Sequence, residues 1–181
     1  MEIKRDFYLN ELIDRIDNGL IKIITGIRRC GKSYLLDPIF KDYLIGQGVK
    51  EDHIIKLSLD ERGNSKYLDP DVLDQYIRSL IVDNDKYYLI LDEIQEVKEF
   101  ESVLIGFMHI SNVEIYVTGS NSKFLSSDIV TEFRGRGDEI RIYPLSFAEF
   151  YAAFDGDYDD AWEEYMIYGG LPQVLQFSVE R

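Results

Sequence analysis

Gly26-Ile27-Arg28-Arg29-Cys30-Gly31-Lys32-Ser33 is a complete G-x-x-x-x-G-K-S loop and is the most informative stretch of this chain. The Ile-rich residues 20–25 before it are typical of a β-strand, and residues 32–43 after it are typical of a helix. In that context the glycines allow a tight turn, and successive backbone N–H groups and the helix N-terminus attract one anion. A chance glycine turn before an ordinary helix is the alternative, and the two flanking elements disfavour it.

The residues of this loop have separate predicted tasks. Lys32 is expected to reach the β- and γ-phosphates of a nucleotide, and the Ser33 hydroxyl is expected to bind Mg²⁺. The backbone of the loop and of the first helical turn is expected to surround the phosphates. The predicted nucleotide-binding residues are Gly26, Ile27, Arg28, Arg29, Cys30, Gly31, Lys32, Ser33 and Tyr34.

Two carboxylates end a second apolar segment, residues 87–91. This pattern predicts a buried strand in which Asp92 holds Mg²⁺ through its water shell. Glu93 is one residue on, where a strand side chain faces the other way, so we expect it to orient a water molecule on the γ-phosphate. A strand that ends in a solvated acidic turn is the alternative, and the phosphate loop upstream disfavours it. The paired acids favour ATPases over small GTPases, because D-x-x-G is absent here and N-K-x-D is absent from the chain.

Polar residues follow a later predicted strand, residues 113–118. Ligands bind at the carboxyl ends of parallel strands, so Ser120 and Asn121 are candidate sensors of the γ-phosphate. The alternative is that a serine there caps the next helix. Arg136 lies between two glycines, and it is either part of a solvated loop or an arginine finger. Such a finger could act on its own subunit or on a neighbour.

Strands and helices alternate along the chain, which predicts an α/β fold with a parallel sheet flanked by helices. We expect about five strands, at residues 20–25, 53–59, 87–92, 113–118 and 139–143. Pro38 is expected to bend or shorten the helix that follows the phosphate loop. Ser146 and Glu149 have the spacing of a capping box that opens a later helix.

Composition limits the classes of protein that fit. A length of 181 residues with 45% hydrophobic residues suits one α/β core, and the single cysteine, Cys30, excludes an intrachain disulfide. No apolar run is long enough to cross a membrane, and the N-terminus lacks the apolar segment of a signal peptide, so we expect a cytoplasmic location.

Charge bears on the expected partners. The excess of 34 acidic over 20 basic residues gives a net charge of −14, which argues against this segment clamping nucleic acid. Residues 142–180 carry many Asp and Glu but no Lys or Arg. This stretch is either a solvated acidic surface or a docking face for a basic protein partner.

The order of these motifs resembles the AAA-type ATPase core of a widespread prokaryotic family, whose members are commonly described as ATP-binding proteins or predicted AAA-superfamily ATPases. The resemblance covers essentially the whole chain. It rests on residues 26–33, 91–95, 118–121, 135–136, 144–150 and 168–172.

The resemblance implies a P-loop NTPase with an AAA-like strand order, in which the phosphate-loop strand lies between the fourth and fifth strands. It implies an ATPase core at residues 1–150, and at 151–181 the start of a helical lid or linker towards a C-terminal domain that is often described as nuclease-like. It also implies that Ser120 or Asn121 is the first sensor and that Arg136 is the finger or another sensor. The catalytic candidates are thus Glu93, Lys32, Arg136, Ser120 and Asn121, and the metal ligands are Ser33 and Asp92.

Two functions follow as hypotheses. The first is Mg²⁺-dependent binding and hydrolysis of ATP, with ATP and ADP as ligands and a homo-oligomer as one expected form. The second is an ATP-switched interaction module that hydrolyses slowly and signals to a protein partner. A nucleic-acid motor is disfavoured by the charge of −14, and no membrane partner is expected. Arg5 and the first helix are near the adenine site only by their order in the chain.

Overall fold

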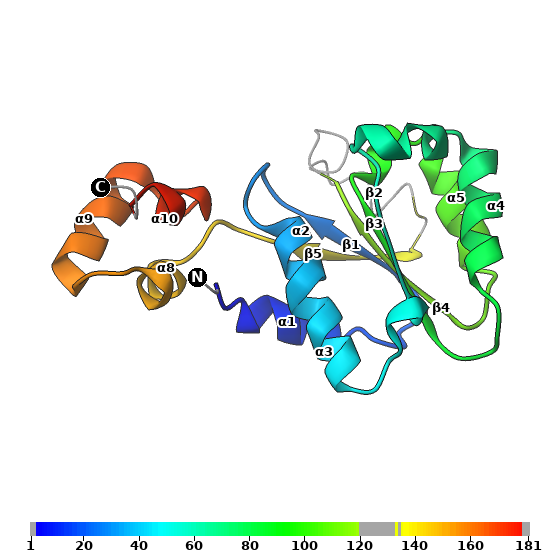
Figure 1. Cartoon of the computed structure of the whole chain (residues 1–181), viewed down its shortest axis with the longest axis horizontal. Helices are drawn as coiled ribbons and strands as arrows, with labels where there is room; N and C mark the ends of the chain where they lie inside the picture. Colours follow the sequence, from blue (N-terminus) through cyan, green and yellow to red (C-terminus); the bar gives the residue numbers. More distant parts are fainter. Residues whose placement is uncertain (1–2, 120–132, 134, 179–181) are drawn as a thin grey trace.

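The computed structural model describes residues 3–119, 133 and 135–178. Its centre is a five-stranded sheet in the order β2-β3-β4-β1-β5, and all neighbouring strands are parallel (Figure 1). The α/β class and the position of the phosphate-loop strand between the fourth and fifth strands are therefore confirmed. The strands are β1 Ile21–Thr25, β2 Ile54–Ser58, β3 Tyr87–Asp92, β4 Val113–Thr118 and β5 Gly137–Arg141.

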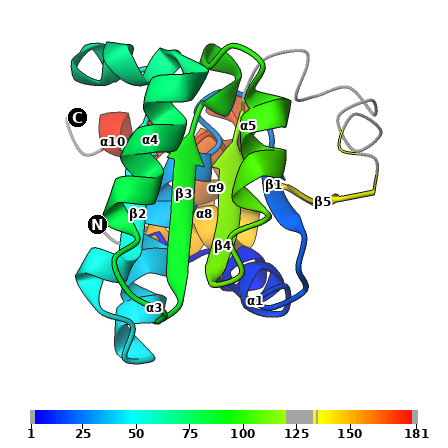
Figure 2. The same cartoon turned by 90° about the vertical axis from the view of Figure 1, so that its right-hand side faces the viewer.

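Helices cover both faces of the sheet, as Figures 1 and 2 show. In β3, Leu89 and Leu91 pack towards α4 and α5, whereas Tyr88 and Ile90 pack towards α1 and α3, because strand side chains alternate between faces. Burial on both faces explains why β3 is apolar throughout rather than alternating in polarity. The helices are α1 Asp6–Ile13, α2 Lys32–Tyr34, α3 Lys41–Gly46, α4 Pro70–Leu80 and α5 Phe100–Phe107.

The helix after the phosphate loop is interrupted as predicted. Asp37 has φ −147° and ψ 112°, which is extended backbone, because the residue before a proline is disfavoured in the helical region. The segment η1 Leu35–Phe40, which contains this break, therefore separates α2 from α3. The remaining short turns are the 3₁₀ segments η2 Glu51–His53, η3 Arg62–Leu68 and η4 Ile94–Glu96.

A smaller helical unit follows the sheet and has its own apolar cluster, which includes Leu145, Phe150 and Leu175. It lies beside the core near the N-terminus, drawn in orange and red in Figure 1. Its helices are α8 Phe147–Ala153, α9 Tyr158–Tyr168 and α10 Gln173–Ser178. The predicted capping box of Ser146 and Glu149 opens α8.

Two details complete the fold. The fifth strand begins and ends two residues earlier than the sequence predicted, because Gly137 and Asp138 pair with the start of β1. Among the described residues, no helix combines the length and apolar character needed to span a membrane.

Candidate functional site

The predicted phosphate loop joins the carboxyl end of β1 to α2. Gly26 has φ 148°, and a Cβ atom there would lie 2.4 Å from the backbone oxygen of Ile142, which follows β5. Gly31 has φ 100°, in the left-handed region, and its carbonyl accepts the N–H of Leu35 at 2.9 Å as the helix begins. Both glycines are thus required by backbone geometry, one for close approach to β5 and one for entry into the helix.

Lys32 crosses the inside of this loop. Its side chain is only 4% exposed, and its Nζ donates to the carbonyl oxygens of Gly26 at 3.0 Å and Ile27 at 3.1 Å. The ammonium group is therefore already held at the loop, where its charge acts in a partly dehydrated environment and is worth more than in bulk water.

The other predicted loop residues divide into two groups. Cys30 is fully buried, and this burial raises the pKa of its thiol, which therefore packs as a neutral side chain. The exposed side chains are those of Ile27, Arg28, Arg29, Ser33 and Tyr34. Of these, Arg29 donates to the Gln173 Oε1 atom at 3.1 Å, which connects the loop to α10.

Asp92 and Glu93 lie at the same edge of the sheet as the phosphate loop, and β4 is the single strand between them and β1. Thr118, at the end of β4, links them: its hydroxyl donates to Asp92 Oδ1 and accepts the backbone N–H of Glu93 at 2.9 Å. Thr118 had no predicted role from the sequence. Thr118 ends the strand that lies between the two motif strands, and this position was a possible indication of a role at the site.

Glu93 is the first residue after β3, and it adopts left-handed backbone angles of φ 54° and ψ 48°. This conformation is uncommon for a residue other than glycine. One oxygen of its carboxylate, Oε2, accepts a hydrogen bond from the Gln95 side-chain amide. The predicted water-orienting residue is therefore held by its backbone and by its side chain.

Arg136 lies where β1 begins, whereas the phosphate loop lies where β1 ends. Its carbonyl accepts the N–H of Ile21 at 2.8 Å, so it precedes β5 just where β1 begins. A five-residue strand such as β1 is about 16 Å long, and this length separates the backbone of Arg136 from the phosphate loop. The Arg136 side chain is exposed and is remote from the loop of its own chain. The predicted sensors Ser120 and Asn121 lie outside the described residues.

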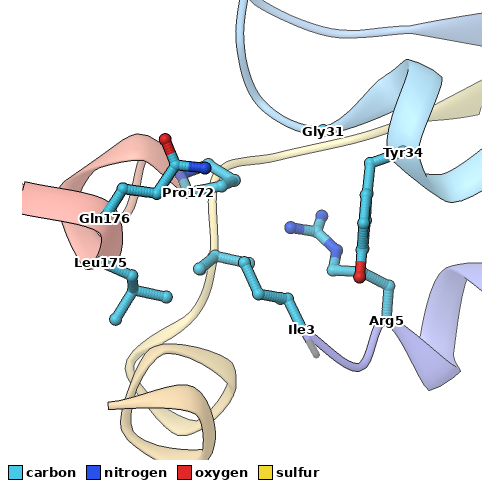
Figure 3. A pocket seen from close by; sticks show the side chains of 8 residues that line it. Ile3, Arg5, Gly31, Tyr34, Pro172, Leu175 and Gln176 are labelled. Carbon is cyan, nitrogen blue, oxygen red and sulfur yellow. The ribbon is translucent and has the colours of Figure 1, made fainter. Parts of the chain in front are cut away.

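A cavity of about 500 Å³ lies next to Gly31, between the core and the smaller helical unit (Figure 3). Arg5 and Tyr34 point towards it from the core, and Pro172 and Leu175 line the other side. Arg5 is 3% exposed and is fixed by donation to the Tyr143 carbonyl at 2.7 Å and by a 3.3 Å ion pair with Glu149. Its buried Nη1 atom has no hydrogen-bond partner among the described residues.

Comparison with known proteins places the chain in a family. The family model described as "AAA domain" matches residues 18–151, and the chain belongs to that family. The structure is similar to the Walker-type ATPase paby2304 of Pyrococcus abyssi, with a TM-score of 0.70 and 18% identity over 99% of this chain and 67% of that one. It is also similar to S. cerevisiae Hsp104 in complex with casein, with a TM-score of 0.67 and 14% identity over 98% of this chain and 36% of that one.

A relative in sequence is an uncharacterized protein of Haemophilus influenzae, 37% identical over 179 residues, which are 96% of this chain and 44% of that protein. The chain spans less than half the length of the curated relatives that it matches. Family and fold together define an AAA domain with the α/β fold of P-loop NTPases.

Proposed function

We propose that this chain binds ATP with Mg²⁺ and hydrolyses it. The observation that carries the proposal is the arrangement at one sheet edge. Thr118 holds Asp92 and Glu93 one strand away from the loop that contains Lys32. A phosphate cradle, a buried cation and two carboxylates at one edge are the parts that phosphoryl transfer to water requires.

Each residue has a task in this proposal. Lys32 exchanges its two carbonyl acceptors for phosphate oxygens, which carry full charge and bind an ammonium group more strongly. The Ser33 hydroxyl and the Asp92 carboxylate are hard oxygen ligands, which suit Mg²⁺. When bound, that ion neutralises charge on the phosphate oxygens. Glu93 orients the attacking water.

The cavity beside Gly31 is proposed as the site of the nucleotide base. It is adjacent to the phosphate loop, and most of its lining is apolar, as a flat aromatic base requires. The Arg5 Nη1 atom, buried and without a partner among the described residues, would donate to a ring nitrogen of the base. Tyr34 and Pro172 would pack against the faces of the ring.

Arg136 is proposed as an arginine finger for the site of a neighbouring subunit, which requires a homo-oligomer. The support is that Arg136 is exposed and lies at the start of β1, whereas its own phosphate loop lies at the end of β1. Ser120 and Asn121 stay predictions as sensors.

The organisation of the longer protein also stays a prediction. This applies to the division near residue 150, the cytoplasmic location and a nuclease-like domain after this segment.

The second candidate function is an ATP-operated switch with slow turnover. It is favoured by the direct contact between Arg29 of the loop and Gln173 of α10, and by a cavity lined from both units. A nucleotide that fills this cavity would hold the two units together. The acidic residues of α9, Asp159, Asp160, Glu163 and Glu164, would then bind a basic protein partner. Turnover measured on the longer protein with and without such partners separates the switch from a constitutive ATPase.

The direct test of hydrolysis is Glu93→Gln, which keeps the side-chain shape and removes the charge. We expect ATP still to bind while turnover falls about 10²-fold, the scale of general-base effects. Glu96→Gln is the matched control, because it makes the same change at an exposed residue three positions on. Equal turnover in the parent and Glu93→Gln would contradict the proposed role of Glu93.

A further inference from the structure

We propose that Gln95 is a positioning residue that holds the Glu93 carboxylate in the orientation needed to align water. The inference rests on the proposed hydrolytic role of Glu93. Its starting point is the hydrogen bond from the Gln95 side-chain amide to Glu93 Oε2, two residues back along the chain.

The backbone that carries the Glu93 carboxylate is fixed by contacts on both sides of it. The Glu93 N–H is bound by the Thr118 hydroxyl at 2.9 Å. The turn after it, η4, is anchored by Ile94 and Val97, which are 0% and 3% exposed in the core shared with α4 and α5. This turn also returns the Gln95 amide towards Glu93. The backbone is therefore set by buried contacts, and the Gln95 amide acts on the carboxylate.

The other end of the same amide shows which of its groups is used. The Gln95 Oε1 atom is buried and has no hydrogen-bond partner among the described residues. A buried carbonyl oxygen without a donor is unfavourable for folding. Methionine, of similar length and volume, would fill this space without that cost. The benefit of glutamine at this position therefore lies in its N–H group, which binds Glu93.

This contact has a defined consequence for the reaction. A donor on one carboxylate oxygen limits rotation of the group and keeps Glu93 directed at one place. Small displacements of a reacting group are costly, because alignment of the nucleophile supplies much of the rate. Gln95 itself makes no contact with the reacting atoms in this scheme, so its effect must pass through Glu93.

The test is Gln95→Met, with Gln47→Met as the control at an exposed glutamine. We expect kcat to fall about tenfold, the scale of a modest loss of alignment. We expect the Kd for ATP to stay within about twofold, because the contact does not involve the phosphates. The melting temperature should be unchanged or higher, since an unsatisfied carbonyl is removed. A merely structural role would predict the opposite change in stability.

A double-mutant cycle separates this inference from the proposed function. Once Glu93→Gln has removed the carboxylate, adding Gln95→Met should lower kcat by less than about twofold. Loss of turnover in Glu93→Gln, together with parental or raised turnover in Gln95→Met, would overturn the Gln95 inference alone. Parental turnover in Glu93→Gln would overturn the role of Glu93 and the inference that rests on it.

A spectroscopic readout tests the contact without turnover. The side-chain amide resonance of Gln95 in a ¹H–¹⁵N spectrum is assigned by its loss in Gln95→Met. We expect this resonance to move upfield in the proton dimension in Glu93→Ala, since a hydrogen bond to a carboxylate shifts it downfield in the parent. An unchanged resonance would show that the contact is not formed, and the inference would then be wrong.

Discussion

Thr118 and Asp92, which end the neighbouring strands β4 and β3, are joined by a side-chain hydrogen bond. The Thr118 hydroxyl donates to Asp92 Oδ1 and accepts the N–H of Glu93. Thr118 is completely buried, so its hydroxyl makes both bonds from within the fold. A side chain for which the sequence predicted no role therefore contacts both motif acids.

The first prediction concerns this hydroxyl. Thr118→Val keeps the shape of the side chain but leaves a buried carboxylate oxygen and a backbone N–H unpaired. We expect the free energy of unfolding to fall by about 1–3 kcal/mol, measured by urea denaturation, and ATP turnover to fall with it. Thr118→Ser is the control, because it loses only a methyl group and keeps the hydroxyl. Retained turnover in Thr118→Val would show that the bond does not position the acids.

The second prediction concerns ATP affinity. Lys32→Ala removes the buried ammonium group of the phosphate loop, and we expect at least about a tenfold weaker Kd for ATP, or about 1.4 kcal/mol. Isothermal titration calorimetry measures this change. Lys41→Ala is the control, since that ammonium group pairs with Glu51 at 2.7 Å instead. An unchanged Kd in a folded Lys32→Ala variant would contradict the assignment of the loop.

The third prediction concerns Arg136 and the oligomer. Because Arg136 lies at the far edge of the sheet, we expect it to act on a neighbour. Arg136→Ala should lower turnover by about 10–10³-fold, with less change in ATP affinity. Arg78→Ala, at a half-exposed arginine that pairs with Asp74, is the control.

Two measurements test the neighbour directly. Parent turnover per subunit should rise with protein concentration. A mixture of Arg136→Ala with Glu93→Gln should regain activity, because a mixed assembly contains some sites with both residues intact. Turnover that is independent of concentration, with no rescue in the mixture, would exclude the neighbour model.

The fourth prediction concerns the pH dependence of stability at the amino edge of the sheet. The buried His53 ring, just before β2, lies 2.7 Å from Asp52 Oδ1 through Nδ1 and 3.1 Å from Asp83 Oδ1 through Nε2. Asp85 lies farther off, at 3.8 Å, and pairs with Lys50 at 2.9 Å. The hydrogen bond with Asp52, aided by Asp83, raises the pKa of His53 above its ordinary value against the opposing effect of burial.

The sign of the effect follows from that direction. A raised pKa in the folded state means that protonated His53 stabilises the fold fully below about pH 6.5, the unfolded value. The stabilisation disappears as pH rises through the folded pKa. His53→Gln should therefore lower the urea midpoint more at pH 5.5 than at pH 8.5. His109→Gln, at the other histidine of the chain, is the control. The same pH-dependent loss in both variants would contradict the prediction.

Much of the local structure could be predicted from short stretches of sequence. The break of the helix before Pro38, the capping box of Ser146 and Glu149, and the bounds of β4 depend on residues a few positions apart. Steric restriction at Pro38 and side-chain capping at Ser146 act over the same short range. The tight turn between β1 and α2 was predictable for the same reason, since Gly26 and Gly31 allow the backbone angles that it needs.

The long-range contacts were not predictable in this way. Arg5 meets the carbonyl of Tyr143, 138 positions later in the chain, and nothing in its neighbours indicates that its guanidinium would line a cavity beside the phosphate loop. The position of Arg136 relative to the phosphate loop could not be predicted from neighbouring residues either. Its spacing suited a finger, but whether it could reach its own site depended on the direction of β5 relative to β1.

The class of fold, and the places of the loop after β1 and of the two acids at the end of β3, could be predicted from the sequence alone. Hydrophobic periodicity and the positions of glycines can be recognised from residues a few positions apart, so they do not require the tertiary structure. Three relations came from the tertiary structure alone: Thr118 links the acids, Gln95 binds Glu93, and Arg136 lies at the end of β1 opposite to its own loop. These relations depend on strand order and side-chain direction, which arise when the whole sheet packs and buries both of its faces.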